Sequence, residues 1–154
     1  MTSDDRVGPY VLETRIAAGD AADVWLAHRA EGGLRVVLKR LLPPWTERSS
    51  VRETFLEIIK DAIPIRHSNI VPVLDFGEAE GYCYVAFERV DGMPLFRVLH
   101  GDEPVGEDRA LAVAQGMVQG LSFVHQRSNP FTGGRLLHGD VSPQNILVDH
   151  AGQV

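Results

Sequence analysis

The sequence contains a single cysteine, Cys83, so it cannot form a disulfide bond within one chain. Small extracellular domains commonly depend on such bonds, and a lone cysteine is typical of a reducing compartment. No apolar run approaches the roughly 18 residues of a membrane-spanning helix, and the first residues lack the pattern of a signal peptide. We therefore expect a soluble cytoplasmic chain without a membrane segment, in which Cys83 is a small buried side chain.

Positive charge is also scarce. Lys and Arg number 15 against 21 Asp and Glu, which gives a net charge of −6, and the basic residues form no cluster. A nucleic-acid-binding surface needs concentrated positive charge, so a nucleic-acid partner is not expected. With 154 residues, of which 44% are hydrophobic and 23% charged, the chain has the composition of one ordinary domain with a buried core. Composition does not determine its oligomeric state.

The most informative stretch covers residues 138–148 and reads His-Gly-Asp-Val-Ser-Pro-Gln-Asn-Ile-Leu-Val. Pro143 fixes its own φ and excludes a regular helix, which predicts a rigid loop anchored by a short apolar strand at 146–148. Asp140 could accept a proton from a hydroxyl, and Asn145 could offer a neutral oxygen to a metal. Phosphoryl transfer uses such a pair to orient the nucleophile and to hold Mg²⁺ at the phosphates. The same residue types are also typical of an ordinary turn before a strand.

Five segments of the first ninety residues predict strands, and they cover residues 10–17, 22–29, 34–41, 71–76 and 82–88. Their hairpin-like succession indicates an antiparallel sheet. Between the third and fourth segments, a helix is predicted from about Val51 to Ile63. We expect Ser50 to be its N-cap in a capping box with Glu53, and Pro64 to end it.

Two further helices are predicted, at residues 95–99 and 108–126. In the longer one, apolar residues recur at spacings of three and four, which is typical of a face buried in a core. These residues are Leu111, Ala114, Met117, Val118, Leu121 and Val124.

Several motifs resemble those of protein kinases. Residues 138–145 resemble the catalytic loop H-R-D-x-x-x-x-N, and also the H-G-D-x-x-x-x-N loop of kinases that phosphorylate aminoglycosides or choline. Residues 36–39, Val-Val-Leu-Lys, resemble the V-A-I-K strand. Residues 67–71 resemble the H-P-N-I-V segment and residues 87–92 the hinge, neither of which is expected in aminoglycoside-type kinases. The resemblance covers residues 9–154 and is closest to bacterial serine/threonine protein kinases.

This resemblance implies an α+β, protein kinase-like fold. Residues 1–8 would be a flexible N-terminus. Residues 9–90 would form an N-terminal lobe with a five-stranded antiparallel sheet and one helix. Residues 91–154 would form a partial helical C-terminal lobe that ends just after the catalytic loop. The resemblance also implies ATP and Mg²⁺ as cofactors and a protein Ser or Thr hydroxyl as the acceptor.

The resemblance assigns roles residue by residue. Lys39 would bind the α- and β-phosphates, Asp140 would orient the substrate hydroxyl, and Asn145 would be a metal ligand. The residues implied at the nucleotide are Ile16 and Gly19 in the phosphate loop, Val24 and Val37 over the adenine, Phe87 as gatekeeper, the Glu88 carbonyl and Val90 N–H at the adenine edge, and Leu147 at the floor of the site.

Several family positions are altered. Ala17 and Ala22 stand where the phosphate loop has glycines, and their methyl groups restrict the approach of backbone N–H groups to a phosphate. Ile58 stands at the position of the helix glutamate that pairs with the strand lysine. The adjacent Glu57 would point about 100° away around the helix. Either a local shift of the helix brings Glu57 to the lysine or the ion pair is missing, and we expect it to be missing.

Two substitutions also affect the catalytic loop. Gly139 replaces the arginine that would answer a phosphorylated activation loop, so that mode of switching is not expected. Ser142 replaces a lysine often found near the transferred phosphate, so charge stabilisation there would be weaker. Residues 75–77 spell the D-F-G metal motif, but they lie inside a predicted strand before the catalytic loop, so we do not expect them to bind magnesium.

The sequence contains no second D-F-G, activation loop or later helices, so we expect a fragment of a longer kinase. As given, the chain would be inactive alone and would expose apolar surface on residues 111–124. The first hypothesis is that the parent protein is a serine/threonine protein kinase. The second is a pseudokinase that acts as a nucleotide-binding or regulatory module. The third, suggested by residues 138–140, is a small-molecule kinase.

Overall fold

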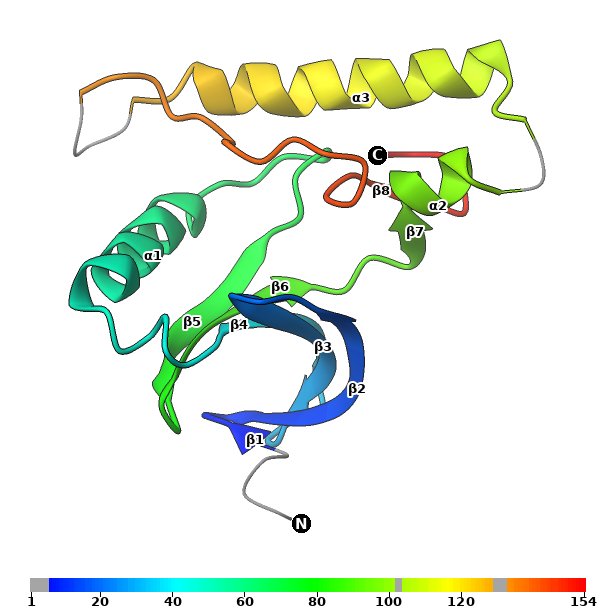
Figure 1. Ribbon diagram of the computed structural model, residues 1–154. Helices are drawn as coiled ribbons and strands as arrows, with labels where there is room; N and C mark the ends of the chain where they lie inside the picture. The colour runs from blue at the N-terminus through cyan, green and yellow to red at the C-terminus, as the bar shows by residue number, and fades with distance from the viewer. Residues whose placement is uncertain (1–5, 102–103, 129–132) are drawn as a thin grey trace. The chain divides into compact units, whose positions relative to one another are not determined.

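The computed structural model describes residues 6–101, 104–128 and 133–154 (Figure 1). The chain forms two compact units, one made of residues up to 65 together with 72–89, the other of residues 66–71 and 90–154. Residues 1–5 of the expected flexible N-terminus lie outside the described part. The end of that segment is ordered, because Arg6–Val7 forms strand β1 and the Val7 side chain is fully buried.

The first unit is built on one six-stranded antiparallel sheet with the order β1-β2-β3-β4-β6-β5. After β1 its strands are β2 Tyr10–Ala18, β3 Ala22–Arg29, β4 Arg35–Leu41, β5 Val73–Ala79 and β6 Tyr82–Glu88. The five predicted strands are therefore confirmed. The fourth of them begins and ends later than predicted, because it pairs with β6 as far as Ala79. The chain then reverses at Glu80 and Gly81, which both have positive φ as tight hairpins require.

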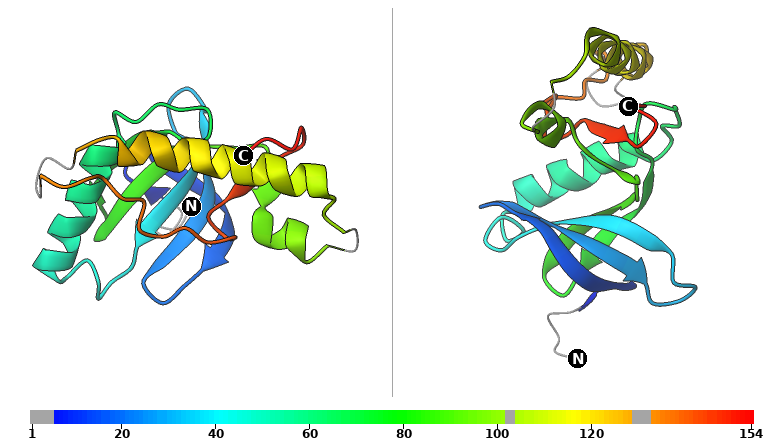
Figure 2. Two further views of the ribbon diagram at one scale, coloured as in Figure 1. Left: turned by 90° about the horizontal axis from the view of Figure 1, so that it is seen from above. Right: turned by 90° about the vertical axis from the view of Figure 1, so that its right-hand side faces the viewer.

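The sheet curves so that β2 comes back toward β5 (Figures 1 and 2). Its inner face carries the buried core of the unit, formed by Val7, Tyr10, Leu12, Ala27, Val36, Leu38, Tyr84 and Ala86. The Tyr10 hydroxyl donates to Asp75 Oδ2 of β5 at 3.0 Å, and the Gly8 N–H donates to the Glu80 carboxylate at 2.8 Å. These two bonds join the first strands to the edge strand β5 and the turn after it.

Asp75 has a structural role, and its location inside a strand was predicted for the early D-F-G. It lies within β5 and accepts hydrogen bonds from the Tyr10 hydroxyl and from the Phe76 N–H. Gly77 makes room for the Tyr84 ring, since a Cβ at this glycine would lie 2.9 Å from the Tyr84 hydroxyl oxygen. Burial, reinforced by the Asp75 carboxylate, raises the pKa of Tyr10 well above its usual range.

Helix α1, Ser49–Ala62, packs on the other face of the sheet. Its Ile59 side chain is buried with Val73 and Val85, and the remaining apolar contacts come from Phe55, Ala62, Ile63, Phe76 and Phe87. The predicted capping box is wrong. Arg48 is the N-cap and its side chain makes no capping hydrogen bond, because the chain already turns from Trp45 to Arg48 and the helix begins before Ser50.

The second unit contains strands β7 Gly92–Pro94 and β8 Leu147–Asp149 and helices α2 Leu95–Leu99 and α3 Glu107–His125. The two strands pair antiparallel, with Gly92 opposite Asp149 and Pro94 opposite Leu147. Its core is formed by Leu95, Val113 and Val148. No helix within the described ranges is long and apolar enough to cross a membrane.

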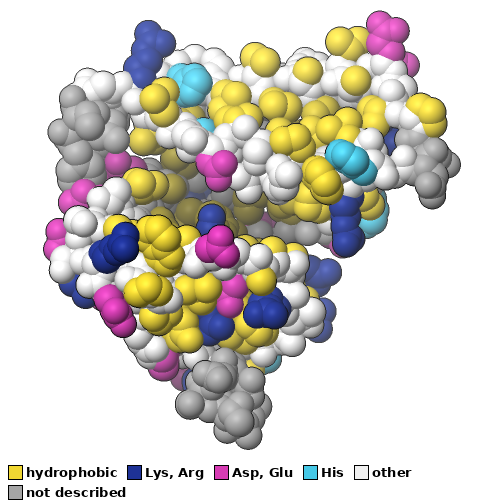
Figure 3. Space-filling model, in the orientation of Figure 1, with side chains coloured by type: hydrophobic (Ala, Val, Ile, Leu, Met, Phe, Trp, Pro, Cys, Tyr) yellow, Lys and Arg dark blue, Asp and Glu magenta, His cyan; other side chains and the backbone are white. Residues whose placement is uncertain are grey.

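The buried face of α3 differs from the prediction. The buried residues of this helix are Val113, Gly116, Gly120 and Val124, whereas Leu111 and Val118 are 61% and 66% exposed. The reason is the segment 66–71, which lies against the two glycines, so that a Cβ at Gly120 would meet the Asn69 backbone oxygen at 3.0 Å. The expectation of apolar surface on residues 111–124 holds, and Figure 3 shows apolar side chains along α3.

We predict that Tyr10→Phe lowers the free energy of unfolding by about 1 to 3 kcal/mol, because Asp75 loses its hydroxyl donor in a partly buried site. Urea denaturation followed by circular dichroism measures this. Tyr82→Phe is the matched control, since the Tyr82 hydroxyl bonds no described residue and the ring next to Arg40 is kept. Equal effects of the two substitutions would contradict the assigned role of Tyr10.

The difference in stability between the unmodified chain and Tyr10→Phe is expected to depend on pH. The raised pKa of Tyr10 keeps the phenol neutral in the folded state, while the unfolded chain ionises above pH about 10. The stability advantage of Tyr10 over the Phe variant should therefore be complete below pH about 10 and shrink as the pH rises further.

A second prediction concerns Gly92. Its missing Cβ would collide with the Val148 backbone oxygen, so Gly92→Ala should break the β7–β8 pairing and cost about 1 to 3 kcal/mol of stability. Gly101→Ala, where a Cβ would meet its nearest neighbour at an ordinary 3.5 Å, should change stability by less than about 0.5 kcal/mol. A Gly92→Ala protein as stable as Gly101→Ala would refute this account of the strand pairing.

Candidate active site

In the first unit, strand register brings four predicted nucleotide residues to one face of the sheet. Lys39 of β4 lies directly between Val24 of β3 and Val85 of β6. Val37 lies opposite Phe87 in the neighbouring row. Because directly paired residues point to the same face, Val24, Val37, Lys39 and Phe87 share the face on which α1 packs.

The predicted phosphate loop joins β2 to β3. Gly19 lies at its start, and its N–H donates to the Ala22 carbonyl at 3.0 Å. The two alanines that replace family glycines belong to the flanking strands, since Ala17 pairs with Val24 and Ala22 begins β3. Ile16 lies at a register shift in β2 and is 57% exposed. The methyl groups therefore sit at the two edges of the loop and not at its tip.

Helix α1 presents no carboxylate to Lys39. Ile58, at the family's glutamate position, is 63% exposed, and Glu57 is exposed as well. Within residues 6–65 and 72–89, the described part of the first unit, Lys39 forms no ion pair. The Lys39 ammonium, held on a half-buried side chain, is therefore not neutralised by α1.

In the second unit, the residues of the predicted catalytic loop lie together. The Asn145 side-chain amide donates to Asp140 Oδ2 at 2.8 Å and to the Asp140 backbone oxygen at 3.1 Å. The Asp140 N–H donates to His138 Nδ1 at 3.3 Å. Both Asp140 and Asn145 are exposed, so their remaining oxygens are open to a ligand. Asp140 and Asn145 thus form one compact polar group.

This loop is held by backbone hydrogen bonds on both sides. The Phe96 N–H at the start of α2 donates to the Pro143 carbonyl at 2.9 Å, and the Leu95 N–H donates to the Ile146 carbonyl at 2.7 Å. Leu147, the predicted floor residue, follows in β8 opposite Pro94. The short strand observed at 147–149 agrees with the predicted anchor at 146–148 apart from one residue.

Gly139 has a backbone conformation that other residues rarely adopt. Its φ is +77°, in the left-handed region where an L side chain is strained. The glycine that replaces the family's arginine is therefore suited to the turn between His138 and Asp140. A Cβ at Gly139 would meet no atom within 4 Å, so the cost of a larger residue there would come from backbone strain alone.

The donor set of the loop fits a hard cation. Mg²⁺ prefers oxygen ligands and is commonly bound by one or two side chains, with water and phosphate oxygens completing its shell. Asn145 Oδ1 and the Asp140 carboxylate supply such oxygens. Among the residues that the structure describes, no three His, Cys, Asp or Glu side chains form a metal-binding group. These oxygens are of the type that Mg²⁺ binds, and the role of Asn145 as a metal ligand stays a prediction.

The predicted hinge residues lie where one unit passes into the other. Phe87 is half-buried near the end of β6, and the Glu88 N–H donates to the Pro72 carbonyl at 3.0 Å. The Glu88 side chain is exposed, and Val90 is the first residue of the later part of the second unit. The Glu88 carbonyl and the Val90 N–H stay predictions as adenine contacts.

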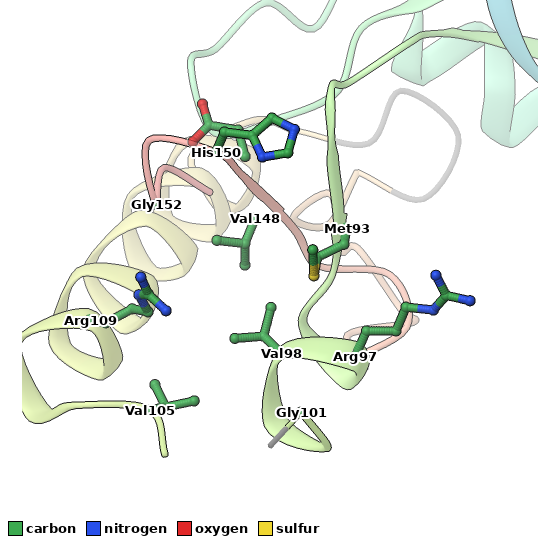
Figure 4. Close-up of a pocket in the computed structure, with 10 residues that line it drawn as sticks. Met93, Arg97, Val98, Gly101, Val105, Arg109, Val148, His150 and Gly152 are labelled. Carbon is green, nitrogen blue, oxygen red and sulfur yellow. The ribbon is translucent and has the colours of Figure 1, made fainter. Parts of the chain in front are cut away.

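The second unit also contains a cavity of about 470 Å³ (Figure 4). Val98 of α2 and Val148 of β8 point toward one another across it. Its other lining residues are Met93, Arg97, Gly101, Val105, Arg109, Asp149, His150 and Gly152. None of them was predicted as a site residue, and the cavity is separate from the Asp140–Asn145 group.

Sequence reasoning missed two residues that shape these loops. Trp45, after β4, donates its indole N–H to the Asp20 backbone oxygen in the β2–β3 loop at 3.2 Å. Gly92 permits the close pairing of β7 with β8. No periodicity marks either residue, because Trp45 follows two prolines outside regular structure and a lone glycine in a short strand resembles a turn residue.

Comparison with known proteins gives a consistent picture. The family model described as the protein kinase domain matches residues 10–154. The chain is 28% identical to the serine/threonine-protein kinase PrkC of Bacillus subtilis over 147 residues, covering 96% of this chain and 22% of that protein. It is 34% identical to the tyrosine-protein kinase MasK of Myxococcus xanthus over 159 residues, covering 96% of this chain and 24% of that protein.

Solved structures resemble the chain over nearly its whole length. The PknI kinase domain of Mycobacterium tuberculosis, in a form with one cysteine replaced by alanine, matches with 27% identity and a TM-score of 0.74, covering 97% of this chain and 58% of that one. The chain therefore spans about a quarter of the curated relatives and somewhat more than half of a solved kinase domain. With the family model matching all but the first nine residues, the chain belongs to the protein kinase domain family.

Proposed function

We propose that the protein carrying this domain transfers the γ-phosphoryl group of ATP to a Ser or Thr hydroxyl of a protein substrate. The observation that supports this most directly is the Asp140–Asn145 pair, joined by a 2.8 Å hydrogen bond in a loop held by backbone contacts. The kinase family match and relatives named serine/threonine-protein kinases, such as PrkC, support the reaction class. We propose the cytoplasm as its location, since the reaction would draw on ATP there.

Asp140 is proposed to orient the acceptor. Its carboxylate is exposed, and Asn145 Nδ2 bonds Oδ2, which fixes the orientation of the group and leaves Oδ1 for a substrate hydroxyl. The carboxylate would accept the hydroxyl's hydrogen bond and take up its proton as the oxygen bonds to the γ-phosphorus, while the bond from that phosphorus to the β–γ bridging oxygen breaks and ADP leaves. Because phosphoryl transfer proceeds through a loose transition state, this positioning contributes more than basicity does.

Lys39 and Asn145 are proposed to handle charge. The Lys39 ammonium, which α1 does not neutralise, would contact the α- and β-phosphate oxygens. The Asn145 side-chain oxygen would be a ligand of Mg²⁺, which when bound neutralises charge that develops on the phosphoryl oxygens. Val24 and Val37, on the sheet face that carries Lys39, would provide an apolar surface for the adenine.

A pseudokinase is the second candidate, and a specific observation favours it. Ile58 is exposed at the glutamate position of α1, so the helix does not hold the Lys39 ammonium in place. Family kinases need that ion pair for full activity. A protein with this change could bind nucleotide and regulate a partner without transferring phosphate. The two candidates differ in what the protein acts on, since a kinase has a phosphorylated protein substrate and a pseudokinase has a regulated partner.

The nucleotide arm of the proposal predicts that Mg·ATP raises the melting temperature of the chain. Lys39→Ala should weaken Mg·ATP binding by about tenfold to a hundredfold, the loss expected for a charge-assisted contact. Lys60→Ala, in the last turn of α1, is the matched control and should bind like the unmodified chain. A thermal-shift titration measures all three. No shift with the unmodified chain would remove ATP from the proposal.

The transfer arm is tested in the protein that contains this chain. Asp140→Asn should lower the rate of phosphate transfer to a Ser or Thr substrate by about 10² to 10⁴, the usual contribution of such a group. Asp108→Asn, an exposed carboxylate in the first turn of α3, should leave the rate unchanged. Radiolabelled ATP with protein, tyrosine-peptide and kanamycin acceptors identifies the acceptor. Nucleotide binding without any transfer would favour the pseudokinase, and transfer to kanamycin alone a small-molecule kinase.

A further inference from the structure

The segment that follows β4 is hydrogen-bonded to the tip of the predicted phosphate loop. The Trp45 indole N–H donates to the Asp20 carbonyl at 3.2 Å. The Leu42 N–H donates to the Ala21 carbonyl at 2.9 Å. Two consecutive carbonyls of a three-residue loop are thus bound by one short segment, residues 42–46, which we call the clamp segment.

The clamp segment is itself fixed. The Trp45 and Thr46 N–H groups both donate to the Leu42 carbonyl, at 2.8 and 3.3 Å, which makes one tight turn. The buried Thr46 side chain donates its hydroxyl to the Gly81 carbonyl at 2.9 Å, in the hairpin between β5 and β6. The Arg48 guanidinium lies 5.0 Å from the centre of the Trp45 ring. The indole therefore has a defined position.

The far side of the loop is equally constrained. Asp23, just inside β3, is 3% exposed and accepts two hydrogen bonds from the Arg40 guanidinium, at 2.8 and 3.0 Å. That guanidinium lies 4.3 Å from the centre of the Tyr82 ring. A buried bidentate pair of this kind holds both strand ends in one geometry. The three-residue loop is therefore bounded by β3, whose start this ion pair holds, and is hydrogen-bonded to the clamp segment.

We propose that Trp45 is a positioning residue for phosphate binding, which acts by fixing the backbone of residues 19–21. This inference rests on the proposed function. Phosphate loops bind through backbone N–H groups, and their glycines normally provide the freedom to close on the phosphate. Here Ala17 and Ala22 reduce that freedom. The clamp segment holds the loop in place beforehand, so less conformational entropy is lost on binding.

Trp45→Phe removes the indole N–H and keeps an aromatic ring. The chain contains one other tryptophan, Trp25, whose indole N–H has no hydrogen-bond partner among the described residues. Trp25→Phe is therefore the matched control, because it deletes the same atoms without breaking a hydrogen bond and keeps a ring beside Arg40. Melting temperatures of both variants, measured first, establish whether each variant folds.

The first measurement is amide hydrogen exchange, which needs no nucleotide. Trp45→Phe should speed exchange of the Gly19 and Leu42 amides by about threefold to tenfold, the effect of losing one ordinary hydrogen bond. Trp25→Phe should leave both rates unchanged. Unchanged exchange in Trp45→Phe overturns the clamp, whether or not the chain binds nucleotide. A similar increase in both variants also overturns it, since the cause would then be general loosening.

The second measurement separates phosphate positioning from a general structural effect. Trp45→Phe should weaken Mg·ATP and Mg·ADP binding by about threefold to tenfold, the effect of losing one ordinary hydrogen bond. Adenosine, which has no phosphates, should bind as before. Equal weakening for adenosine, or none for ATP, overturns the positioning role. If the unmodified chain binds no Mg·ATP, the proposed function fails and the positioning role with it, while the exchange data still report on the clamp separately.

Discussion

The pairing of β4 with β3 on one side and β6 on the other is the constraint on which the first unit depends. In this register the buried core and the candidate nucleotide residues occupy opposite faces of the same sheet. A shift of one residue would send Lys39 into the core and bring Arg40 to the outer face. The buried Asp23–Arg40 ion pair opposes that shift, because any other pairing would leave a charge unpartnered in the interior.

Strand and helix positions were largely predictable, since they follow from local signals. A hairpin-like succession of apolar segments located the strands, Pro64 marked the end of α1, and Pro143 together with the apolar run after it identified the catalytic loop. The buried face of α3 was not predictable. The apolar stripe and the two glycines mark different faces of the helix, and the glycine face is buried because residues 66–71 pack against it. The Tyr10–Asp75 bond joins positions 65 residues apart, which no local pattern reveals.

The candidate site was predictable to a similar extent. Residue identities came from motifs, and the structure groups Asp140 with Asn145 and aligns Lys39 with Val24. What the motifs could not provide was the support behind each loop. Trp45 and Gly92 act through one hydrogen bond and one missing Cβ, so they leave no pattern in the sequence. The two altered elements therefore differ in how well they are held in place. Hydrogen bonds restrain the phosphate loop, whereas α1 does not hold Lys39, because the exposed Ile58 stands at the glutamate position.

The second unit is closed by contacts between distant parts of the chain. Asn69 donates a side-chain hydrogen bond to the Val154 carbonyl, 85 positions away, and β7 pairs with β8 across both helices. Closing loops of this length is entropically unfavourable, and folds of high contact order form slowly. During synthesis the sheet of the first unit, complete at Glu88, can form early. The loop with Asp140 and Asn145 is anchored by β8, so it can be completed only after β8 has been synthesised, whereas all strands of the sheet that carries Lys39 are synthesised before it.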